Sequence, residues 1–178
     1  MEKSLINIQY FKTPFGDLVI GSYDDKLCLC DWRYRKSRDF IDKRIQIGLN
    51  AQYKKADSNI IGETQTQLEA YFKRTRSEFN IPLLLVGSDF QKRIWNELLQ
   101  IPYGKTETYL GLSRKIGNEK AVRAVATANG ANAISIIVPC HRIVGSNGDL
   151  VGYAGGIGTK KKLLQLENVL VDNQLSLF

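Results

Sequence analysis

A pair of short helices separated by a single glycine constrains the fold more than any other feature of the sequence. Thr108 can cap a helix over residues 109–116, which ends at Gly117. Asn118 can then cap a second helix over residues 119–130. Two helices joined by a short glycine turn are typical of a helix-turn-helix, whose second helix enters a DNA groove.

The residues after this motif predict β structure. Residues 133–138 (AISIIV) are a β-branched run typical of a buried strand. Residues 142–153 predict a hairpin that turns at Asn147-Gly148. Two helices followed by a hairpin are the arrangement of a winged helix, which we therefore expect in this half of the chain.

Two more helices flank this region. Ser88 or Asp89 can cap a helix that runs to about residue 100. A final helix is expected over residues 159–170, with Thr159 as its cap. Three consecutive lysines, residues 160–162, stand in its first turn. We expect them to lie exposed at the start of the helix and not to form a phosphate-binding site.

The first half has a different pattern. Residues 4–11, 15–22 and 27–32 alternate as strands, with a turn between the last two. Residues 36–48 and 62–76 have apolar side chains at helical spacing. Polar residues and a proline then interrupt the pattern. We expect an α+β protein with an α/β domain at residues 1–83 and a winged-helix domain at 84–178.

The charge favours an anionic partner without proving one. The chain of 178 residues holds 25 Lys and Arg against 18 Asp and Glu, a net charge of +7. A basic stretch suits nucleic acid, although a solvated surface without a partner explains the charge equally well. Between positions 92 and 142 three glutamates face these basic residues: Lys92, Arg93, Lys105, Arg114, Lys115, Lys120, Arg123 and Arg142.

Cysteine and histidine are scarce. Three Cys and one His make a disulfide scaffold and a histidine-based metal site unexpected, so no metal is predicted. The start of the sequence lacks a signal-peptide core, and no apolar run approaches the roughly 20 residues of a membrane span. We expect a cytoplasmic protein without a membrane partner. Cys28 and Cys30 are assigned to the core.

The second helix of the predicted motif is rich in alanine and glycine. Small side chains allow a helix to approach another helix or a nucleic-acid groove closely, and the composition favours neither. Arg123 is a long cation that projects from this otherwise small-residue helix. On most helices such an arginine is simply solvated.

The only histidine stands beside a cysteine, in the run Val138-Pro139-Cys140-His141-Arg142. Pro139 cannot donate a ladder hydrogen bond, so it ends the predicted strand and fixes the backbone ahead of Cys140. A free thiol has a pKa of about 8.5, and a nearby base enlarges its thiolate fraction. A reactive thiol and an ordinary buried cysteine both fit these residues.

The stretch 129–167 (NGANAISIIVPCHRIVGSNGDLVGYAGGIGTKKKLLQLE) closely resembles the O6-alkylguanine-DNA alkyltransferases, also called methylated-DNA–protein-cysteine methyltransferases. Its PCHR core, with GYAGG and LL-x-x-E downstream, is highly specific. The resemblance covers residues 90–168, is closest to short bacterial members, and extends loosely over 1–89. There the family has a ribonuclease H-like domain, so this fold is expected for the N-terminal half.

The resemblance implies a role for each catalytic position. Cys140 matches the acceptor cysteine, His141 the water-linked base and Glu167 the acid that orients the imidazole. Asn132 matches the asparagine that braces the active-site turn. Tyr109 matches the tyrosine that crowds the DNA phosphate and aids protonation of the leaving guanine.

The resemblance also implies how DNA is held. Arg123 matches the finger that enters the duplex where the target base has left. Asn118 and Ser146 align with DNA-contacting positions, and Pro139 and Tyr153 are expected to line the substrate pocket. The partner is double-stranded DNA that contains O6-alkylguanine, the protein is expected to be a monomer, and no cofactor is expected.

The implied function is DNA repair by transfer of the alkyl group of O6-methylguanine, and of O4-methylthymine, to Cys140. The lesion lies inside the stack, so the nucleotide must be flipped out at a few kcal/mol of unstacking. A thioether offers water no good leaving group, so the protein acts once. The alternatives are a Cys-His hydrolase, a non-enzymatic protein that binds alkylated DNA, and a transcription regulator that uses the helix-turn-helix alone.

Overall fold

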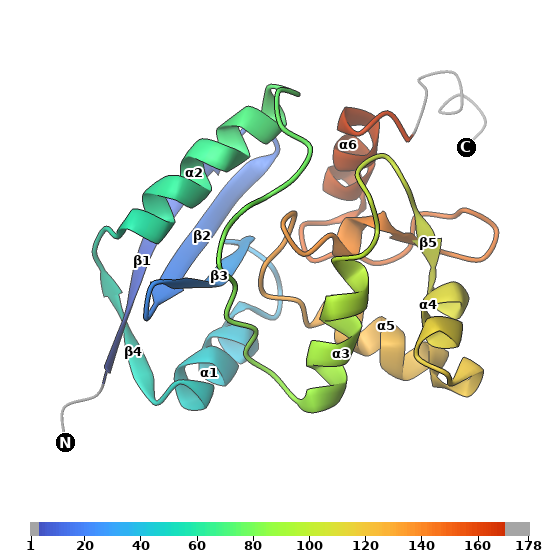
Figure 1. Ribbon diagram of the computed structural model, residues 1–178, viewed down its shortest axis with the longest axis horizontal. Coiled ribbons are helices and arrows are strands. Elements are labelled where there is room, and N and C mark those ends of the chain that lie inside the picture. The colour runs from blue at the N-terminus through green and yellow to red at the C-terminus, as the bar shows by residue number, and fades with distance from the viewer. Residues whose placement is uncertain (1–3, 170–178) are drawn as a thin grey trace.

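The computed structural model describes residues 4–169 and arranges them in two halves that lie side by side (Figure 1). The N-terminal half is built on a four-stranded sheet of order β3-β2-β1-β4. β1 (Ser4–Thr13), β2 (Gly16–Tyr23) and β3 (Lys26–Trp32) are antiparallel neighbours, and β4 (Ala51–Lys55) pairs with β1 in parallel. The three predicted strands are confirmed. β4 was not predicted, because this short edge strand is largely polar and offers only one alternating pair, Ala51 and Tyr53.

Two helices complete the N-terminal half. α1 (Arg38–Gly48) lies in the predicted segment and leads into β4. α2 (Asn59–Phe72) covers one face of the sheet and packs on β1 and β2. The prediction of 62–76 was displaced toward the C-terminus. The helix begins earlier because the Ser58 hydroxyl accepts a hydrogen bond from the backbone N–H of Ile61 at 3.1 Å.

An extended segment, residues 73–88, joins the two halves and runs along the start of β3 (Figure 1). The backbone N–H of Leu27 donates to the carbonyl of Pro82, and the N–H of Leu84 donates to the carbonyl of Leu27, both at 2.8 Å. The linker is therefore attached to the N-terminal sheet. The division of the chain at residues 83 and 84 stays a prediction.

The helix-turn-helix is present as predicted. α4 (Tyr109–Lys115) is capped by Thr108, and its chain reverses at Gly117, whose φ of +78° favours glycine. The Asn118 side chain caps a 3₁₀ turn, η1 (Glu119–Ala121), that leads into α5 (Val122–Gly130). α3 (Asp89–Leu98) packs on α4 and α5, and a capping box of Ser88 and Gln91 fixes its start.

Two predicted β elements of this half are wrong. Residues 133–138 are buried but form a compact turn, in which the N–H of Val138 donates to the carbonyl of Ile134 and Ile136 has a φ of 71°. The hairpin over 142–153 is also absent. In place of the first predicted strand of this hairpin, the short strand β6 (Ile143–Val144) pairs in parallel with β5 (Glu107–Thr108). The Asn147-Gly148 turn lies in the loop that follows β6.

The last helix, α6 (Ile157–Leu166), begins earlier than predicted. Gly156, at a φ of +87°, precedes it, so Thr159 is not its cap but lies in its first turn. Glu167 stands at its C-terminal end. The predicted continuation to residue 170 is wrong, because the helix ends at Leu166 and Asn168 has a φ of 59°, which a helix does not adopt.

The core cluster that contains Cys140 crosses the two halves and surrounds the segment before this residue. It contains Leu68 and Tyr71 of α2 together with Trp95 of α3 and Val138. β3 also reaches the buried turn directly, because the N–H of Cys30 donates to the carbonyl of Ala133 at 2.9 Å. The N-terminal sheet therefore helps to fix the turn. No helix within residues 4–169 is long and apolar enough to cross a membrane.

Candidate active site

Cys140 begins a single helical turn, η2 (Cys140–Arg142), directly after the compact turn. The buried Asn132 side chain holds this turn together. Its Oδ1 accepts from the N–H of Ile134 at 2.9 Å, and its Nδ2 donates to the carbonyl of Val138 at 2.9 Å and to Cys140 Sγ at 3.2 Å. A side-chain amide thus replaces the strand ladder that the sequence predicted and positions the thiol.

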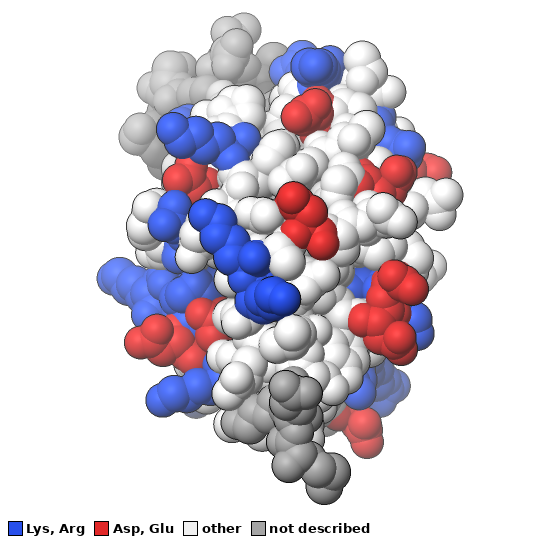
Figure 2. Space-filling model, turned by 90° about the vertical axis from the view of Figure 1, so that its left-hand side faces the viewer, with Lys and Arg blue, Asp and Glu red and all other residues white. Residues whose placement is uncertain are grey.

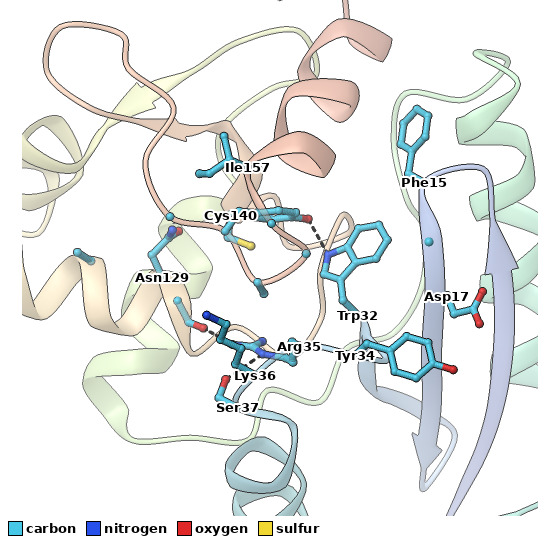
Figure 3. A pocket seen from close by; sticks show the side chains of 18 of the residues that line it. Phe15, Asp17, Trp32, Tyr34, Arg35, Lys36, Ser37, Asn129, Cys140 and Ile157 are labelled. Carbon is cyan, nitrogen blue, oxygen red and sulfur yellow. Dashed lines mark hydrogen bonds between the residues drawn. The ribbon is translucent and has the colours of Figure 1, made fainter.

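The Cys140 thiol lines a cavity but is almost fully buried, with 3% of the residue exposed (Figure 3). Burial raises its pKa, and the hydrogen bond from Asn132 offsets only part of this effect. The resting group is therefore a protonated thiol at neutral pH. A base must remove its proton before or during attack on a substrate.

His141 and Glu167 form a fully buried pair, with 2.7 Å between Nε2 and Oε1. A proton on Nε2 satisfies the carboxylate and leaves Nδ1 as the basic atom. Nδ1 has no hydrogen-bond partner within the described part of the chain. Burial lowers the pKa of His141, although Glu167 works in the opposite direction, so the imidazole is neutral and able to accept a proton.

The Glu167 carboxylate is held by more donors than the sequence indicated. Arg142 donates from Nε at 2.9 Å and from Nη2 at 3.0 Å, and Tyr71 donates from its hydroxyl at 2.7 Å. The N–H of Gly104 adds a fourth contact at 3.2 Å. Burial alone would raise the pKa of Glu167, but the hydrogen bonds from His141 and Arg142 and the positive charge of Arg142 prevail and lower it to about 2.

Lys160 is fully buried, contrary to the expected exposed helix start. Its ammonium group donates to the carbonyls of Ile143, Val151 and Gly152, the last two at 3.0 and 3.3 Å. Burial lowers its pKa to about 8, so it remains charged at pH 7. It fastens η2 and β6 to the loop that follows them. The sequence held one signal of this burial: Lys160 stands three and four residues before Leu163 and Leu164, and so shares their buried face of the helix.

The cavity in front of Cys140 has a volume of about 770 Å³ and is lined by both halves of the protein. Tyr109 and Tyr153 stand in its wall, and the Tyr109 hydroxyl donates to the carbonyl of Val151 at 3.1 Å. Trp32 of β3 completes the wall (Figure 3). Pro139 is buried where the chain enters η2 and is not among the lining residues, so its predicted role stays a prediction.

The three remaining predicted residues lie on the surface, outside the cavity. Arg123 projects from α5, and its guanidinium forms no ion pair in the portion of the chain that is described. Asn118 caps η1, and Ser146 lies in the loop after β6. The structure does not bring these side chains to Cys140, and their contacts with DNA stay predictions.

The site has the parts of a thiol-transfer centre. Within residues 4–169 no three His, Cys, Asp or Glu side chains are grouped to bind a metal ion. A buried thiol, a neutral imidazole and a buried carboxylate lie together behind a helix-turn-helix. This fold and this site define a class: two-domain DNA-binding proteins with a nucleophilic cysteine.

Comparisons with known proteins give the particular family. The family model described as "6-O-methylguanine DNA methyltransferase, ribonuclease-like domain" matches residues 6–85. The model described as "6-O-methylguanine DNA methyltransferase, DNA binding domain" matches residues 89–169. The methylated-DNA–protein-cysteine methyltransferase of Mycobacterium bovis is 51% identical over 177 residues, covering 98% of this chain and 99% of the relative. That of Mycobacterium leprae is 38% identical over 177 residues, with the same coverage.

A solved structure agrees. Mycobacterium tuberculosis OGT in complex with DNA superposes with a TM-score of 0.77 at 37% identity, covering 90% of this chain and 92% of that one. The chain belongs to the 6-O-methylguanine DNA methyltransferase family. The predicted family and its two-domain α+β fold, with a ribonuclease-like first domain, are confirmed.

Proposed function

We propose that this protein repairs double-stranded DNA by transferring the alkyl group of O6-methylguanine, and of O4-methylthymine, to Cys140. One observation carries the proposal. Cys140 lies in a cavity beside α5, with Asn132 hydrogen-bonded to its sulfur, and the next residue, His141, is paired with Glu167. The names of the relatives support the same activity, a methylated-DNA–protein-cysteine methyltransferase.

The transfer is a single displacement. The Cys140 sulfur forms a bond to the alkyl carbon as the bond from that carbon to guanine O6 breaks, and the electron pair of the broken bond leaves with guanine. His141 accepts the thiol proton at Nδ1, directly or through a water, and Glu167 stabilises the imidazolium. Burial raises the pKa of the Tyr109 hydroxyl, so this group keeps its proton, which it can donate to the leaving base once it gives up its hydrogen bond to Val151.

The product limits the protein to one event. The S-alkyl bond of a thioether gives water no good leaving group, and no second thiol lies in the cavity, since the other two cysteines are buried in the core. The three unpaired cysteines support a reducing compartment, and we place the protein in the cytoplasm. A monomer is sufficient, because one chain supplies every group of the proposed mechanism.

The DNA-facing charge is smaller than the sequence count suggested. Arg142 is buried on Glu167, Arg114 pairs with Glu119 at 3.0 Å, and Lys115 pairs with Glu107 at 3.0 Å. Figure 2 shows the side of the molecule formed by the N-terminal sheet and its helices, where basic and acidic side chains are interspersed. This mixed charge does not favour DNA, so we place the DNA instead on the face of α4 and α5, where Arg123 is exposed.

The test is intact-protein mass spectrometry after mixing with a duplex that carries one O6-methylguanine. We expect one methyl group per molecule, located on Cys140, with no further turnover and no transfer by Cys140→Ala. Repeated turnover would indicate a Cys-His hydrolase, and binding without transfer would indicate a lesion-binding protein or a regulator. A methyl group on Cys28 or Cys30 would also contradict the proposal.

Arg123→Ala is expected to slow repair in duplex DNA by about tenfold or more, because the gap left by the flipped base is no longer filled. Reaction with free O6-benzylguanine should be unchanged, since no base has to leave a stack. Single-turnover rates on both substrates measure this difference. Lys120→Ala, an exposed cation of η1, is the control for general loss of charge. An equal loss on both substrates would rule out the finger role.

A further inference from the structure

The N-terminal domain contributes an aromatic side chain to the wall of the cavity. Trp32, the last residue of β3, is only 4% exposed and lies among the lining residues. Its indole Nε1 donates a hydrogen bond to the Tyr153 hydroxyl at 3.1 Å, and the two rings meet edge to face with centroids 6.2 Å apart. The side chain expected to line the substrate pocket is thus held by a different domain.

Trp32 also supports the backbone of the loop that contains Tyr153. A Cβ atom placed on Gly155 would lie 2.8 Å from both Cε2 and Nε1 of the indole. Such a separation is too short for real atoms, so the loop rests directly on the tryptophan ring. On the other side of the ring, a Cβ on Gly16 would lie 3.4 Å from Cζ3. The indole is therefore fixed between the loop and the start of β2.

The cavity continues past this ring. Figure 3 shows Trp32 between Cys140 on one side and Phe15 and Asp17 on the other. Phe15 and Tyr34 line the outer part, and the total volume of about 770 Å³ is within the range of about 300–1,000 Å³ that accommodates drug-sized ligands. A guanine base with one methyl group is smaller than such a ligand. Trp32 thus stands in the wall between the part of the cavity at Cys140 and the part lined by Phe15.

We propose that Trp32 is a specificity-determining residue that limits the size of the O6 substituent accepted at Cys140. The indole fixes Tyr153 by a hydrogen bond and the 152–156 loop by contact, and so narrows the part of the cavity at Cys140 and slows transfer from bulky groups. Removing the ring widens the passage between the two parts of the cavity, so that a benzyl-sized substituent reaches toward Phe15. This inference rests on the proposed alkyl transfer and extends it to the range of substrates.

The experiment compares rate constants for transfer to Cys140 from DNA containing O6-methylguanine and from DNA containing O6-benzylguanine. For Trp32→Ala we expect the benzyl-to-methyl ratio to rise about tenfold or more, as changes in pocket size produce. Trp32→Phe retains a ring against Gly155 but lacks the N–H donor, so its ratio should rise less. Ile45→Ala, in a separate core cluster, is the control for lost stability and should keep the wild-type ratio.

A Trp32→Ala ratio within twofold of the wild type, or a shift matched by Ile45→Ala, would overturn the inference. Trp32→Phe provides the same comparison if the alanine variant does not fold, as thermal unfolding will reveal. A wild-type protein that accepts neither group contradicts the alkyl transfer itself, and the inference with it. Methyl transfer by the wild type with an unaltered variant ratio contradicts only the role of Trp32.

Discussion

Glu167→Gln is expected to lower the free energy of unfolding by about 3–5 kcal/mol, because it leaves the Arg142 guanidinium buried without a counter-charge. Methyl transfer should slow by about 10²- to 10⁴-fold, since the imidazolium formed at His141 loses its stabilising carboxylate. Urea unfolding and single-turnover rates measure the two effects. Glu69→Gln, an exposed carboxylate of α2, should change the stability by no more than about 0.5 kcal/mol.

The same carboxylate predicts a pH dependence. The pKa of Glu167 falls from an ordinary 4.5 to about 2 in the folded protein, so its contribution to stability is present above pH 4.5 and is lost as the pH falls toward 2. The stability difference between the wild type and Glu167→Gln should therefore be constant near neutral pH and shrink in that acid range. A difference that does not vary with pH would contradict the charged state assigned to Glu167.

Lys160→Met is expected to lower the free energy of unfolding by about 2–4 kcal/mol, because three backbone carbonyls lose their donor in a buried place. Methyl transfer should fall by about 10²-fold, as the loop that carries Tyr153 is no longer fastened to β6. Chemical denaturation and transfer rates at pH 7, below the Lys160 pKa of about 8, measure both quantities.

Lys162→Met is the matched control on the same helix. Its side chain is exposed and, among residues 4–169, approaches only the Phe15 ring, at 5.9 Å, so stability and transfer should remain near the wild type. If Lys160→Met behaves like Lys162→Met, the buried ammonium does not hold the loop.

Local signals in the sequence predicted much of the fold. Thr108, Gly117 and Asn118 placed the helix-turn-helix, because caps and helix stops act on residues within one turn of themselves. The prediction of a strand at 133–138 was wrong because a local composition does not show which groups the buried backbone will bond to. β-branched composition reports burial, and the side chain of Asn132 gave this buried backbone partners other than a ladder.

The sequence by itself determined the family, the two-domain fold and the residues proposed to carry the chemistry, because Cys140, His141 and Glu167 stand in a specific local motif. Only the tertiary structure decided what surrounds them. Tyr71 reaches Glu167 from 96 positions away, Lys160 is buried while Lys162 is exposed, and Trp32 lines the cavity from the other domain. Such contacts depend on the packing of separate elements, and no pattern within one segment specifies which distant side chain will meet it.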